Sequence, residues 1–306
     1  MGRDEMHVDE VEADESLVGR LIAGQFPQWA DLPVERVHSA GTDNAVYRLG
    51  DEMAVRLPRI EWATRQVDKQ HQWLSKLAPF LALGIPVPLA RGMPGEGYPW
   101  EWSICPWFEG ETASIDRFAD PRQAATELAH FITALQRIDP TGGPLPGAHN
   151  SGRGEALSQR DTETRAAIAS LEDSVDIGAV TSAWDAALQA PSWQDPPVWI
   201  HGDLSPGNLL VDRGRLSAVI DFGCLGVGDP ACDLMVAWTL FSGESRDAFR
   251  ATLAVDPATW ARGRGWALSW AMIFIPYYLE TNPVGVGLAR RTIDHVLADH
   301  ASVDGE

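Results

Sequence analysis

The sequence contains few cysteines, and they are not arranged as a disulfide framework or a zinc site. Cys105, Cys224 and Cys232 form no CxxC pair and have no histidine partner nearby. Structural zinc sites and disulfide-rich folds need closely spaced Cys or Cys/His pairs. We therefore expect free thiols and a protein of the reducing cytoplasm.

Long apolar segments are also missing. The most apolar run, residues 266–279, is shorter than the roughly 20 residues needed to cross a bilayer and contains Pro276. No secretory signal opens the chain, and Met6 stands where a myristoylation motif has Ser or Thr. We predict a cytoplasmic protein with no membrane partner.

Basic residues are scarce relative to acidic ones. The chain has 24 Lys and Arg against 43 Asp and Glu, a formal net charge of −19. Nucleic-acid binding depends on basic patches, so a nucleic-acid partner is not expected. The excess of carboxylates suits a cationic substrate, although solubility alone explains it equally well. Because the N-terminus is especially acidic, we predict that residues 1–15 are disordered.

The first third of the chain has the pattern of an antiparallel sheet. Short β-like runs alternate with Gly, Asp and Asn, and one segment has the spacing of an amphipathic helix. Ser16 is a candidate N-cap for an earlier helix. The predicted strands are residues 34–37, 45–49, 53–57, 87–90 and 100–104, with the inserted helix at 62–77.

The character of the sequence changes after Gly110, where helical patterns dominate. A turn at residues 212–214 leads into a strand, and the other periodic segments read as helices. Strands followed by helices, over 306 residues, predict an α+β protein of two lobes with domains 1–109 and 110–306. The predicted strand is residues 216–220, and the predicted helices are 121–138, 155–171, 180–188, 234–240, 266–278 and 288–297.

Two segments carry residues suited to phosphoryl transfer. Residues 200–210 read Ile-His-Gly-Asp-Leu-Ser-Pro-Gly-Asn-Leu-Leu, and residues 219–223 read Val-Ile-Asp-Phe-Gly. The reaction needs a carboxylate that orients the attacking hydroxyl and oxygen ligands for Mg²⁺. We predict that Asp203 is the first, and that Asn208 and Asp221 are the second. Either segment alone is an ordinary turn or strand end, but both in this order favour catalysis.

These segments resemble the Brenner-type motif and the DFG-like segment of the aminoglycoside phosphotransferase family, which includes macrolide phosphotransferase-like members. Residues 228–234, Gly-Asp-Pro-Ala-Cys-Asp-Leu, are similar to its GDPxxDL segment, so the resemblance covers nearly the whole chain. It implies a protein-kinase-like fold with a five-stranded antiparallel nucleotide-binding lobe and a mainly helical lobe. It also implies that Asp233 braces the catalytic loop near His201, although a helix cap would explain Asp233 as well.

The resemblance also implies residues for the nucleotide phosphates. Arg56 stands where the family's third strand carries a Lys, and its guanidinium keeps the charge and can bind phosphate bidentately. Gln70 stands where the partner carboxylate is expected, with Glu61 or Asp68 as alternatives. The loop before the second strand is an ordinary hairpin turn on its own, but it matches the family's nucleotide loop through Gly41, Thr42, Asp43 and Asn44.

The nucleotide base and the acceptor have further candidates. Residues 105–110 resemble the hinge beside the base, where Pro106 offers a carbonyl group and Phe108 an amide. For the acceptor, carboxylates could bind an ammonium group and aromatics could line a pocket, although for any single residue a buried core helix is the more common explanation. The acceptor-binding candidates are Asp229, Trp270, Phe274, Tyr277, Tyr278 and Glu280.

The sequence therefore predicts an antibiotic-type kinase. It would use Mg²⁺ to transfer the γ-phosphoryl group of ATP or GTP to a hydroxyl of an aminoglycoside or macrolide, or of a nucleoside antibiotic, and so confer resistance. A metabolic kinase for choline, homoserine or a sugar would share the motifs. A non-catalytic pseudokinase would lack the base or a metal ligand, all of which are present. The sequence leaves the acceptor, the nucleotide, and the choice between monomer and homodimer open.

Overall fold

The protein forms two compact units. In this computed structural model, residues 11, 13–37, 43–171 and 174–304 are described. Unit 1 spans Met1–Glu111 and Ser217–Gly223, and unit 2 spans Thr112–Leu216 and Cys224–Glu306. Segment Ser217–Gly223, which carries Asp221, thus belongs to unit 1 although it lies far along the chain. The predicted boundary at Gly110 assigned this later segment to the second domain.

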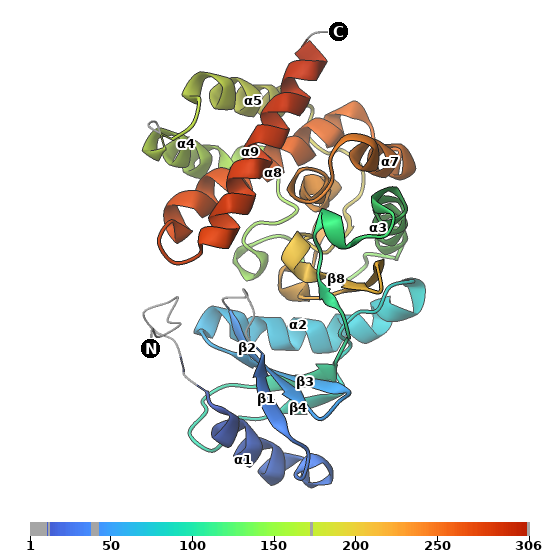
Figure 1. The fold of residues 1–306 in the computed structure, drawn as a ribbon, viewed down its shortest axis with the longest axis vertical. Coiled ribbons are helices and arrows are strands. Elements are labelled where there is room, and N and C mark those ends of the chain that lie inside the picture. The colour runs from blue at the N-terminus through green and yellow to red at the C-terminus, as the bar shows by residue number, and fades with distance from the viewer. Residues whose placement is uncertain (1–10, 12, 38–42, 172–173, 305–306) are drawn as a thin grey trace. The chain divides into compact units, whose positions relative to one another are not determined.

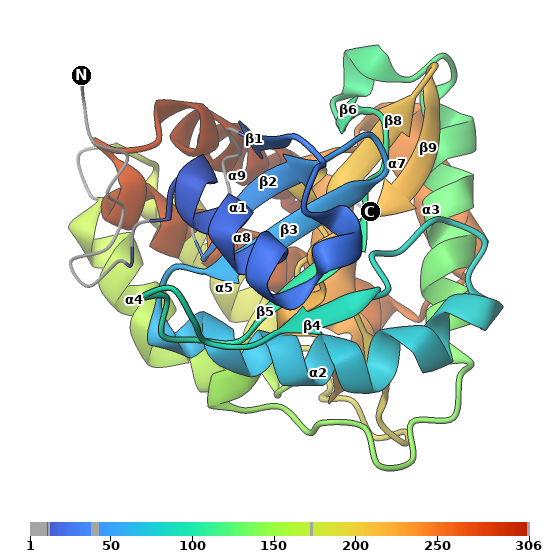
Figure 2. The ribbon, with the colours of Figure 1, turned by 90° about the horizontal axis from the view of Figure 1, so that it is seen from below.

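Unit 1 is built on a five-stranded antiparallel sheet with strand order β1-β2-β3-β5-β4. Burial in β2 alternates between intermediate and buried, as expected for a strand with one face on a core. Helix α1, Glu15–Gln25, lies against the sheet (Figure 2) and buries Val18, Leu21 and Ile22 in a cluster with Tyr47 and Trp102. The strands are β1 Val34–Val37, β2 Asn44–Leu49, β3 Met53–Pro58, β4 Ala90–Gly92 and β5 Trp102–Pro106.

Helix α2, Glu61–Leu77, follows β3 and contacts β3 and β5. After it, Gly84 forms backbone hydrogen bonds with segment Ser217–Gly223. Its N–H donates to the Ser217 carbonyl at 3.1 Å, and its carbonyl accepts from Val219 N–H at 2.9 Å. These two bonds anchor the segment that carries Asp221 within unit 1.

The structure confirms five antiparallel strands and the inserted helix, with two shifts. Strand β4 begins at Ala90 instead of residue 87 because Pro86 and Pro88 have no N–H to donate to a neighbouring strand. Strand β5 is also displaced, to Trp102–Pro106. Both shifts leave the predicted strand order along the chain unchanged.

The N-terminal predictions need correction where the structure describes them. Helix α1 is capped by Asp14, whose Oδ1 accepts from Leu17 N–H at 2.7 Å, and not by Ser16. Ala13 is buried, and its carbonyl oxygen accepts from the Tyr47 hydroxyl. The predicted disorder is therefore wrong for residues 13–15, while residues 1–10 and 12 lie outside the described part.

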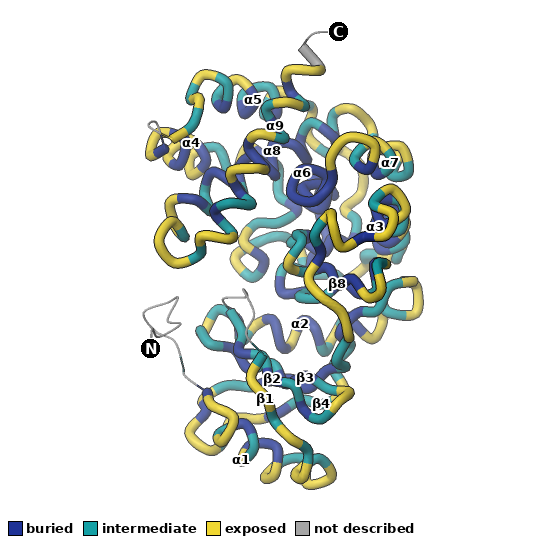
Figure 3. The backbone as a smooth tube through the Cα atoms, viewed as in Figure 1, coloured by how far each residue is buried: buried dark blue, intermediate teal, exposed yellow. Residues whose placement is uncertain are grey.

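Unit 2 is mainly helical. Helices α8 and α9 pack side by side (Figure 1), and α6 is buried along its length (Figure 3). Two small sheets accompany them, with strand orders β6-β8-β9 and β10-β7. The helices are α3 Pro121–Gln136, α4 Asp161–Ser170, α5 Ile177–Gln189, α6 Val236–Thr239, α7 Gly243–Leu253, α8 Pro257–Tyr278 and α9 Pro283–Asp304. The strands are β7 Val198–Ile200, β8 Leu209–Asp212 and β10 Gly226–Gly228, with β6 Glu111–Thr112 and β9 Arg215–Val219, of which Glu111 and residues 217–219 belong to unit 1.

Several predicted helices in unit 2 have different limits. Helix α8 begins nine residues before the predicted start, because Asp256 caps it by accepting from the N–H groups of Ala258 and Thr259. Helix α7 was not predicted, since its sequence is largely polar and buries only Ser245 and Phe249. Among the described residues, no helix is both long and apolar enough to cross a membrane.

Candidate active site

In unit 2, a buried carboxylate holds the backbone of the loop that follows β7. The N–H groups of His201 and Gly202 donate to Oδ2 and Oδ1 of Asp233 at 2.8 and 2.7 Å. Burial raises the pKa of the Asp233 carboxyl, although His201 and the two amides act in the opposite direction. This is the contact that the family resemblance led us to expect, and it fixes the backbone directly before Asp203.

Gly202 is required by the geometry of this loop. Its φ is +83°, a conformation that L side chains rarely adopt. A Cβ atom at this position would lie 2.5 Å from the carbonyl oxygen of Cys224. Only glycine therefore allows the chain to turn between His201 and Asp203.

Asp203 is held by the residue predicted to bind metal. The side-chain amide of Asn208 donates from Nδ2 to the Asp203 carbonyl oxygen at 2.8 Å and to its Oδ2 at 2.9 Å. The Asp203 backbone N–H donates to Nδ1 of His201 at 3.2 Å. These hydrogen bonds close the loop from Asp203 to Asn208. Leu209 and Leu210, which follow the loop, are buried in the core.

Sequence reasoning missed Arg153, which lies beside Asp203 in unit 2. Its NH2 atom is 4.0 Å from Oδ1 of Asp203, and the Arg153 side chain is only 11% exposed. Nothing in the sequence around Arg153 marks it, because it lies fifty residues before Asp203 in a Gly- and Pro-rich loop. The contact depends on the tertiary fold of the unit.

In unit 1, Asp221 faces Arg56. Arg56 NH2 lies 2.9 Å from Asp221 Oδ1, and Arg56 NH1 donates to Gln70 Oε1 at 3.4 Å. Burial, the largest single influence, lowers the pKa of Arg56, but the charge and hydrogen bond of Asp221, together with Cys105 and Asp43, outweigh it, so that pKa is raised. Gln70 therefore contacts Arg56 from the position where the family resemblance implies a partner carboxylate. The carboxylate that pairs with Arg56 is that of Asp221.

The other proposed partners of Arg56 lie elsewhere. Asp68 pairs with Arg91, which also pairs with Glu101. Glu61 is exposed in the first turn of α2. Neither acidic residue takes the place of Gln70.

One face of α2 contacts the segment that contains Asp221. Gln66, Lys69 and Gln70 are buried polar residues at positions i, i+3 and i+4, which share a helix face. Lys69 Nζ donates to the Gly223 carbonyl at 2.6 Å, and a Cβ on Gly223 would lie 2.8 Å from Gln66 Oε1. Sequence reasoning missed Gln66 and Lys69, although polar residues at this spacing beside apolar Val67 and Leu74 could have indicated them.

Part of the predicted nucleotide loop lies outside the described residues, namely Gly41 and Thr42. Of the rest, Asn44 Nδ2 donates to Gln66 Oε1 at 3.2 Å, and Gln66 Nε2 donates to Asp43 Oδ2 at 3.4 Å. Gln66 therefore links the beginning of β2 to α2. The phosphate-binding role of this loop stays a prediction.

The predicted hinge continues directly from β5. Pro106 ends the strand opposite Met53, and Trp107 N–H donates to the Glu52 carbonyl at 2.8 Å. The Phe108 ring packs on Gly84, where an added Cβ would lie 2.6 Å from the ring. The base-binding roles of Pro106 and Phe108 stay a prediction.

The acceptor-binding role predicted for Asp229 is wrong. This residue is 5% exposed, and its carboxylate receives Nε and NH2 of Arg262 at 2.8 and 3.2 Å. It also caps the turn that follows by accepting from Ala231 N–H at 2.9 Å. Since a buried ion pair and a cap occupy its oxygens, Asp229 is a structural residue of unit 2.

The predicted aromatic residues form a row at the end of α8. Ring centroids are 5.2 Å apart between Trp270 and Phe274, and 4.5 Å apart both between Phe274 and Tyr278 and between Tyr277 and Tyr278. Tyr277 is 60% exposed, and Glu280 is exposed two residues after the helix ends. The row can present aromatic surface to a ligand, and its role as an acceptor site stays a prediction.

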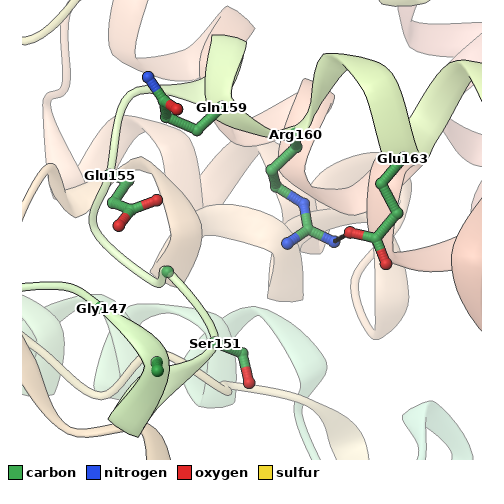
Figure 4. A pocket seen from close by; sticks show the side chains of 8 residues that line it. Gly147, Ser151, Glu155, Gln159, Arg160 and Glu163 are labelled. Carbon is green, nitrogen blue, oxygen red and sulfur yellow. Dashed lines mark ion pairs between the residues drawn. The ribbon is translucent and has the colours of Figure 1, made fainter.

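Unit 2 also contains a pocket that sequence reasoning missed, with a volume of about 290 Å³. Arg160 Nε donates to Ser269 Oγ at 2.8 Å. Its NH2 atom lies 3.9 Å from Oε2 of Glu163 (Figure 4). Burial, together with the nearby charge of Arg153, lowers the pKa of Arg160 to about 10. The polar lining suits a hydroxyl-rich or charged ligand, and includes Ser151, Glu155, Gln159, Arg160 and Glu163.

The residues predicted to bind Mg²⁺ fit that ion in their chemistry. Asn208 uses Nδ2 for Asp203, which leaves its carbonyl oxygen for a cation, and Asp221 supplies a carboxylate. Within the described residues, no group of three or more His, Cys, Asp or Glu side chains could hold a metal. Few protein oxygens are typical of Mg²⁺ sites, where waters and substrate phosphates complete the octahedron.

The chain is similar in sequence to known phosphotransferases. The chain is 27% identical to an aminoglycoside 3'-phosphotransferase of Escherichia coli over 45% of this chain and 51% of the relative. The chain spans about half the length of the curated relatives it matches.

Solved structures are similar in fold over most of the chain. The GDP and kanamycin complex of APH(2")-IIia has a TM-score of 0.70 at 19% identity, covering 93% of this chain and 98% of that one. A macrolide 2'-phosphotransferase type I has a TM-score of 0.62 at 19% identity, covering 93% and 98%. These likenesses confirm the predicted α+β, protein-kinase-like fold.

The model of the phosphotransferase enzyme family matches residues 34–266, well over half of the chain. That range includes the catalytic loop, the Asp221 segment and Arg56. The resemblance drawn from the motifs is therefore confirmed, and the chain belongs to the phosphotransferase enzyme family.

Proposed function

We propose that the protein is an antibiotic-type kinase that phosphorylates a hydroxyl of an aminoglycoside or a macrolide and so confers resistance. The observation that carries the proposal is the catalytic loop, in which Asn208 holds Asp203 while Asp233 receives the two preceding amides. Kanamycin in one similar structure and the macrolide phosphotransferase name of another support these acceptor classes.

Asp203 is the residue we assign to the acceptor hydroxyl. Its carboxylate accepts a hydrogen bond from the hydroxyl and takes the proton as that oxygen attacks the γ-phosphorus. A new oxygen–phosphorus bond forms, the bond from the γ-phosphorus to the β,γ-bridging oxygen breaks, and a nucleoside diphosphate leaves. Asp203 is suited to this role because it is one-third exposed while Asn208 fixes its orientation.

The remaining roles concern the nucleotide. Arg56 binds phosphate oxygens, and Asn208 and Asp221 are the metal ligands of units 2 and 1. Mg²⁺, bound with the nucleotide, neutralises charge that develops on the phosphates. The predicted loop and hinge bind the phosphates and the base through Gly41, Thr42, Asp43, Asn44, Pro106 and Phe108.

For the donor we keep both ATP and GTP. A similar structure contains GDP, which supports a guanine nucleotide without excluding adenine. For the acceptor, the pocket with Glu155 and Glu163 favours a cationic aminoglycoside. The aromatic row of Trp270, Phe274, Tyr277 and Tyr278, followed by Glu280, favours a larger apolar acceptor such as a macrolide.

The test is a transfer assay that detects nucleoside diphosphate in the presence of Mg²⁺. Aminoglycosides, macrolides, nucleoside antibiotics, choline, homoserine and sugars are each offered with ATP and with GTP. We expect turnover with an aminoglycoside or macrolide, and a raised inhibitory concentration of that drug in bacteria expressing the protein. Turnover only with choline, homoserine or a sugar would replace the proposal with a metabolic kinase.

Asp203→Ala is the matched variant for this assay. It removes the proton acceptor, so we expect kcat to fall by about 10²- to 10⁴-fold, while nucleotide affinity stays close to that of the unchanged protein. Nucleotide titration followed by fluorescence measures the affinity separately. Normal turnover of Asp203→Ala would refute the assignment, and nucleotide binding without any transfer by the unchanged protein would favour a pseudokinase.

A further inference from the structure

Arg153 is a buried cation whose hydrogen-bonding groups are incompletely satisfied. Its Nε and NH1 atoms are buried, and within the described part of the chain they have no hydrogen-bond partner. Its NH2 atom lies 4.0 Å from Oδ1 of Asp203, in the same unit. Buried polar groups in proteins are nearly always paired, so an exception calls for an explanation.

Burial of the Arg153 guanidinium is costly, although its interactions with Cys224, Asp203 and Cys232 favour the charged form and raise its pKa. A guanidinium cannot relieve the cost by losing its proton, because its pKa is too high. The Arg153 guanidinium carbon lies 5.3 Å from the centre of the Trp266 ring, and that of Arg160 lies 4.9 Å from the same ring. The ring attracts both cations, but the two like charges repel each other. A site selected only for stability would not place an incompletely bonded cation here.

Arg246 of the same unit provides the contrast. Its guanidinium carbon lies 6.0 Å from the Trp238 ring, so it is also a cation beside a tryptophan. However, Arg246 Nε donates to the Ala237 carbonyl at 2.8 Å, and its NH2 donates to the Phe241 carbonyl at 3.0 Å. Arg246 therefore has the bonds of a structural arginine, and Arg153 does not.

We propose that Arg153 is a positioning residue for Asp203, an inference that rests on the proposed function. Asn208 holds Oδ2 of Asp203 by a hydrogen bond of 2.9 Å, and Arg153 attracts Oδ1 from 4.0 Å. The two contacts together fix the plane of the carboxylate. Since 4.0 Å is too long for a direct hydrogen bond, Arg153 orients Oδ1 without occupying it as a donor would. The acceptor hydroxyl then meets an oxygen whose direction is already set.

The experiment compares Arg153→Met, Arg153→Lys and Arg246→Met in the full-length protein. It measures kcat and KM for the acceptor, nucleotide affinity, and the thermal midpoint of unfolding. Met keeps the length and apolar stem of Arg, which limits the cavity that the substitution leaves. Arg246→Met is the matched control, since it also removes a guanidinium from a tryptophan.

We expect Arg153→Met to lower kcat by about 10- to 100-fold, the size of effect that a misplaced catalytic group causes. Its acceptor KM and nucleotide affinity should change by less than about threefold, and its midpoint should be unchanged or higher because a costly buried charge is removed. Arg153→Lys should recover part of kcat. Arg246→Met should do the opposite, lowering the midpoint while keeping kcat.

Three outcomes would overturn the inference in distinguishable ways. If the unchanged protein transfers phosphate and Arg153→Met turns over as fast, the positioning role fails while the proposed function stands. A loss of kcat in Arg153→Met that accompanies a lowered midpoint, as in Arg246→Met, makes Arg153 structural. If the unchanged protein transfers phosphate to no acceptor, the proposed function and the role of Arg153 fail together.

Discussion

The catalytic loop of unit 2 and the Asp221 segment of unit 1 are held in different ways. In unit 2, a buried carboxylate receives backbone amides, as Asp233 does from His201 and Gly202. In unit 1, side chains of α2 and β3 contact the segment, chiefly Lys69 at Gly223 and Arg56 at Asp221. Backbone contacts do not compete with a ligand, whereas Arg56 and Asp221 are themselves expected to bind phosphate and metal.

The two kinds of support imply different responses to a bound ligand. The loop around Asp203 is fixed before any ligand binds, as an oriented base requires. Arg56 and Asp221 neutralise each other's charge, which lowers the free-energy cost of holding the two charges away from water. When ligands bind, phosphate can take the place of Asp221 beside Arg56, and a metal ion can take the place of Arg56 beside Asp221. We therefore expect substitutions in the first region to act on folding and turnover together, and those in the second to act mainly on stability or nucleotide binding.

The largest effect is expected for Asp233→Ala. It leaves the amides of His201 and Gly202 buried without their acceptor, so the free energy of unfolding should fall by about 2–5 kcal/mol and transfer should be lost. Urea unfolding and the transfer assay measure the two effects. Asp256→Ala is the control, because Asp256 also accepts from two backbone amides but at an exposed helix start. Asp256→Ala should lower the free energy of unfolding by only about 1 kcal/mol and leave kcat unchanged. Equal losses of stability in Asp233→Ala and Asp256→Ala would contradict a special role for Asp233.

An intermediate effect is expected for Lys69→Met. Lys69 is buried and donates to the Gly223 carbonyl, so its loss leaves that carbonyl without the ammonium group. We expect the free energy of unfolding to fall by about 1–3 kcal/mol, with weaker nucleotide binding, measured by urea unfolding and titration. Lys76→Met in the last turn of the same helix is the control, since Lys76 is exposed and lies over the Trp73 ring. A loss no larger than that of Lys76→Met would contradict the anchoring role of Lys69.

The smallest effect is a pH dependence from His71, which also lies on α2. Burial lowers the pKa of His71 below 6.5, and its Nε2 lies 3.1 Å from Ser103 Oγ. The unfolded chain then binds a proton at a higher pH than the folded protein, so the stability contribution is complete above pH 6.5 and is lost as pH falls below it. Unfolding measured from pH 7.5 to 5 should show this loss, and His71→Gln should reduce it. An unchanged pH slope in His71→Gln would exclude His71 as the cause.

The motifs placed Asp203 and Asn208 in one loop, as the structure has them, because the two residues are close together in sequence. Asp203 and Asn208 are five residues apart, and one loop brings them together whatever surrounds it. Strand periodicity predicted the five-stranded sheet for a similar reason, since alternating burial is a local property. Prolines at positions 86 and 88 displaced one strand, which local chemistry also explains.

The errors concern residues whose partners lie far along the chain. The carboxylate of Asp229 could bind an amine, but in the structure it is buried. Its charge is neutralised by Arg262, which lies thirty-three residues later in the sequence. Arg153 carried no signal, because its partner is Asp203, fifty residues away. The spacing of Lys69 on α2 hinted at a buried role, but not at its partner Gly223, 154 residues away. A charged side chain in a sequence has no assigned counterion until the fold supplies one.

From the sequence alone we could predict the five strands and the inserted helix of unit 1, the five-residue spacing of Asp203 and Asn208, and the functional groups that these residues and Asp221 offer. These depend on neighbouring residues, on periodicity and on functional groups that do not change with context. The pairing of Asp221 with Arg56, the buried ion pair of Asp229 with Arg262 and the position of Arg153 beside Asp203 became known only from the folded protein. The reason is physical: burial and the distance between charges determine what an ionisable group can do, and both exist only after the chain has folded.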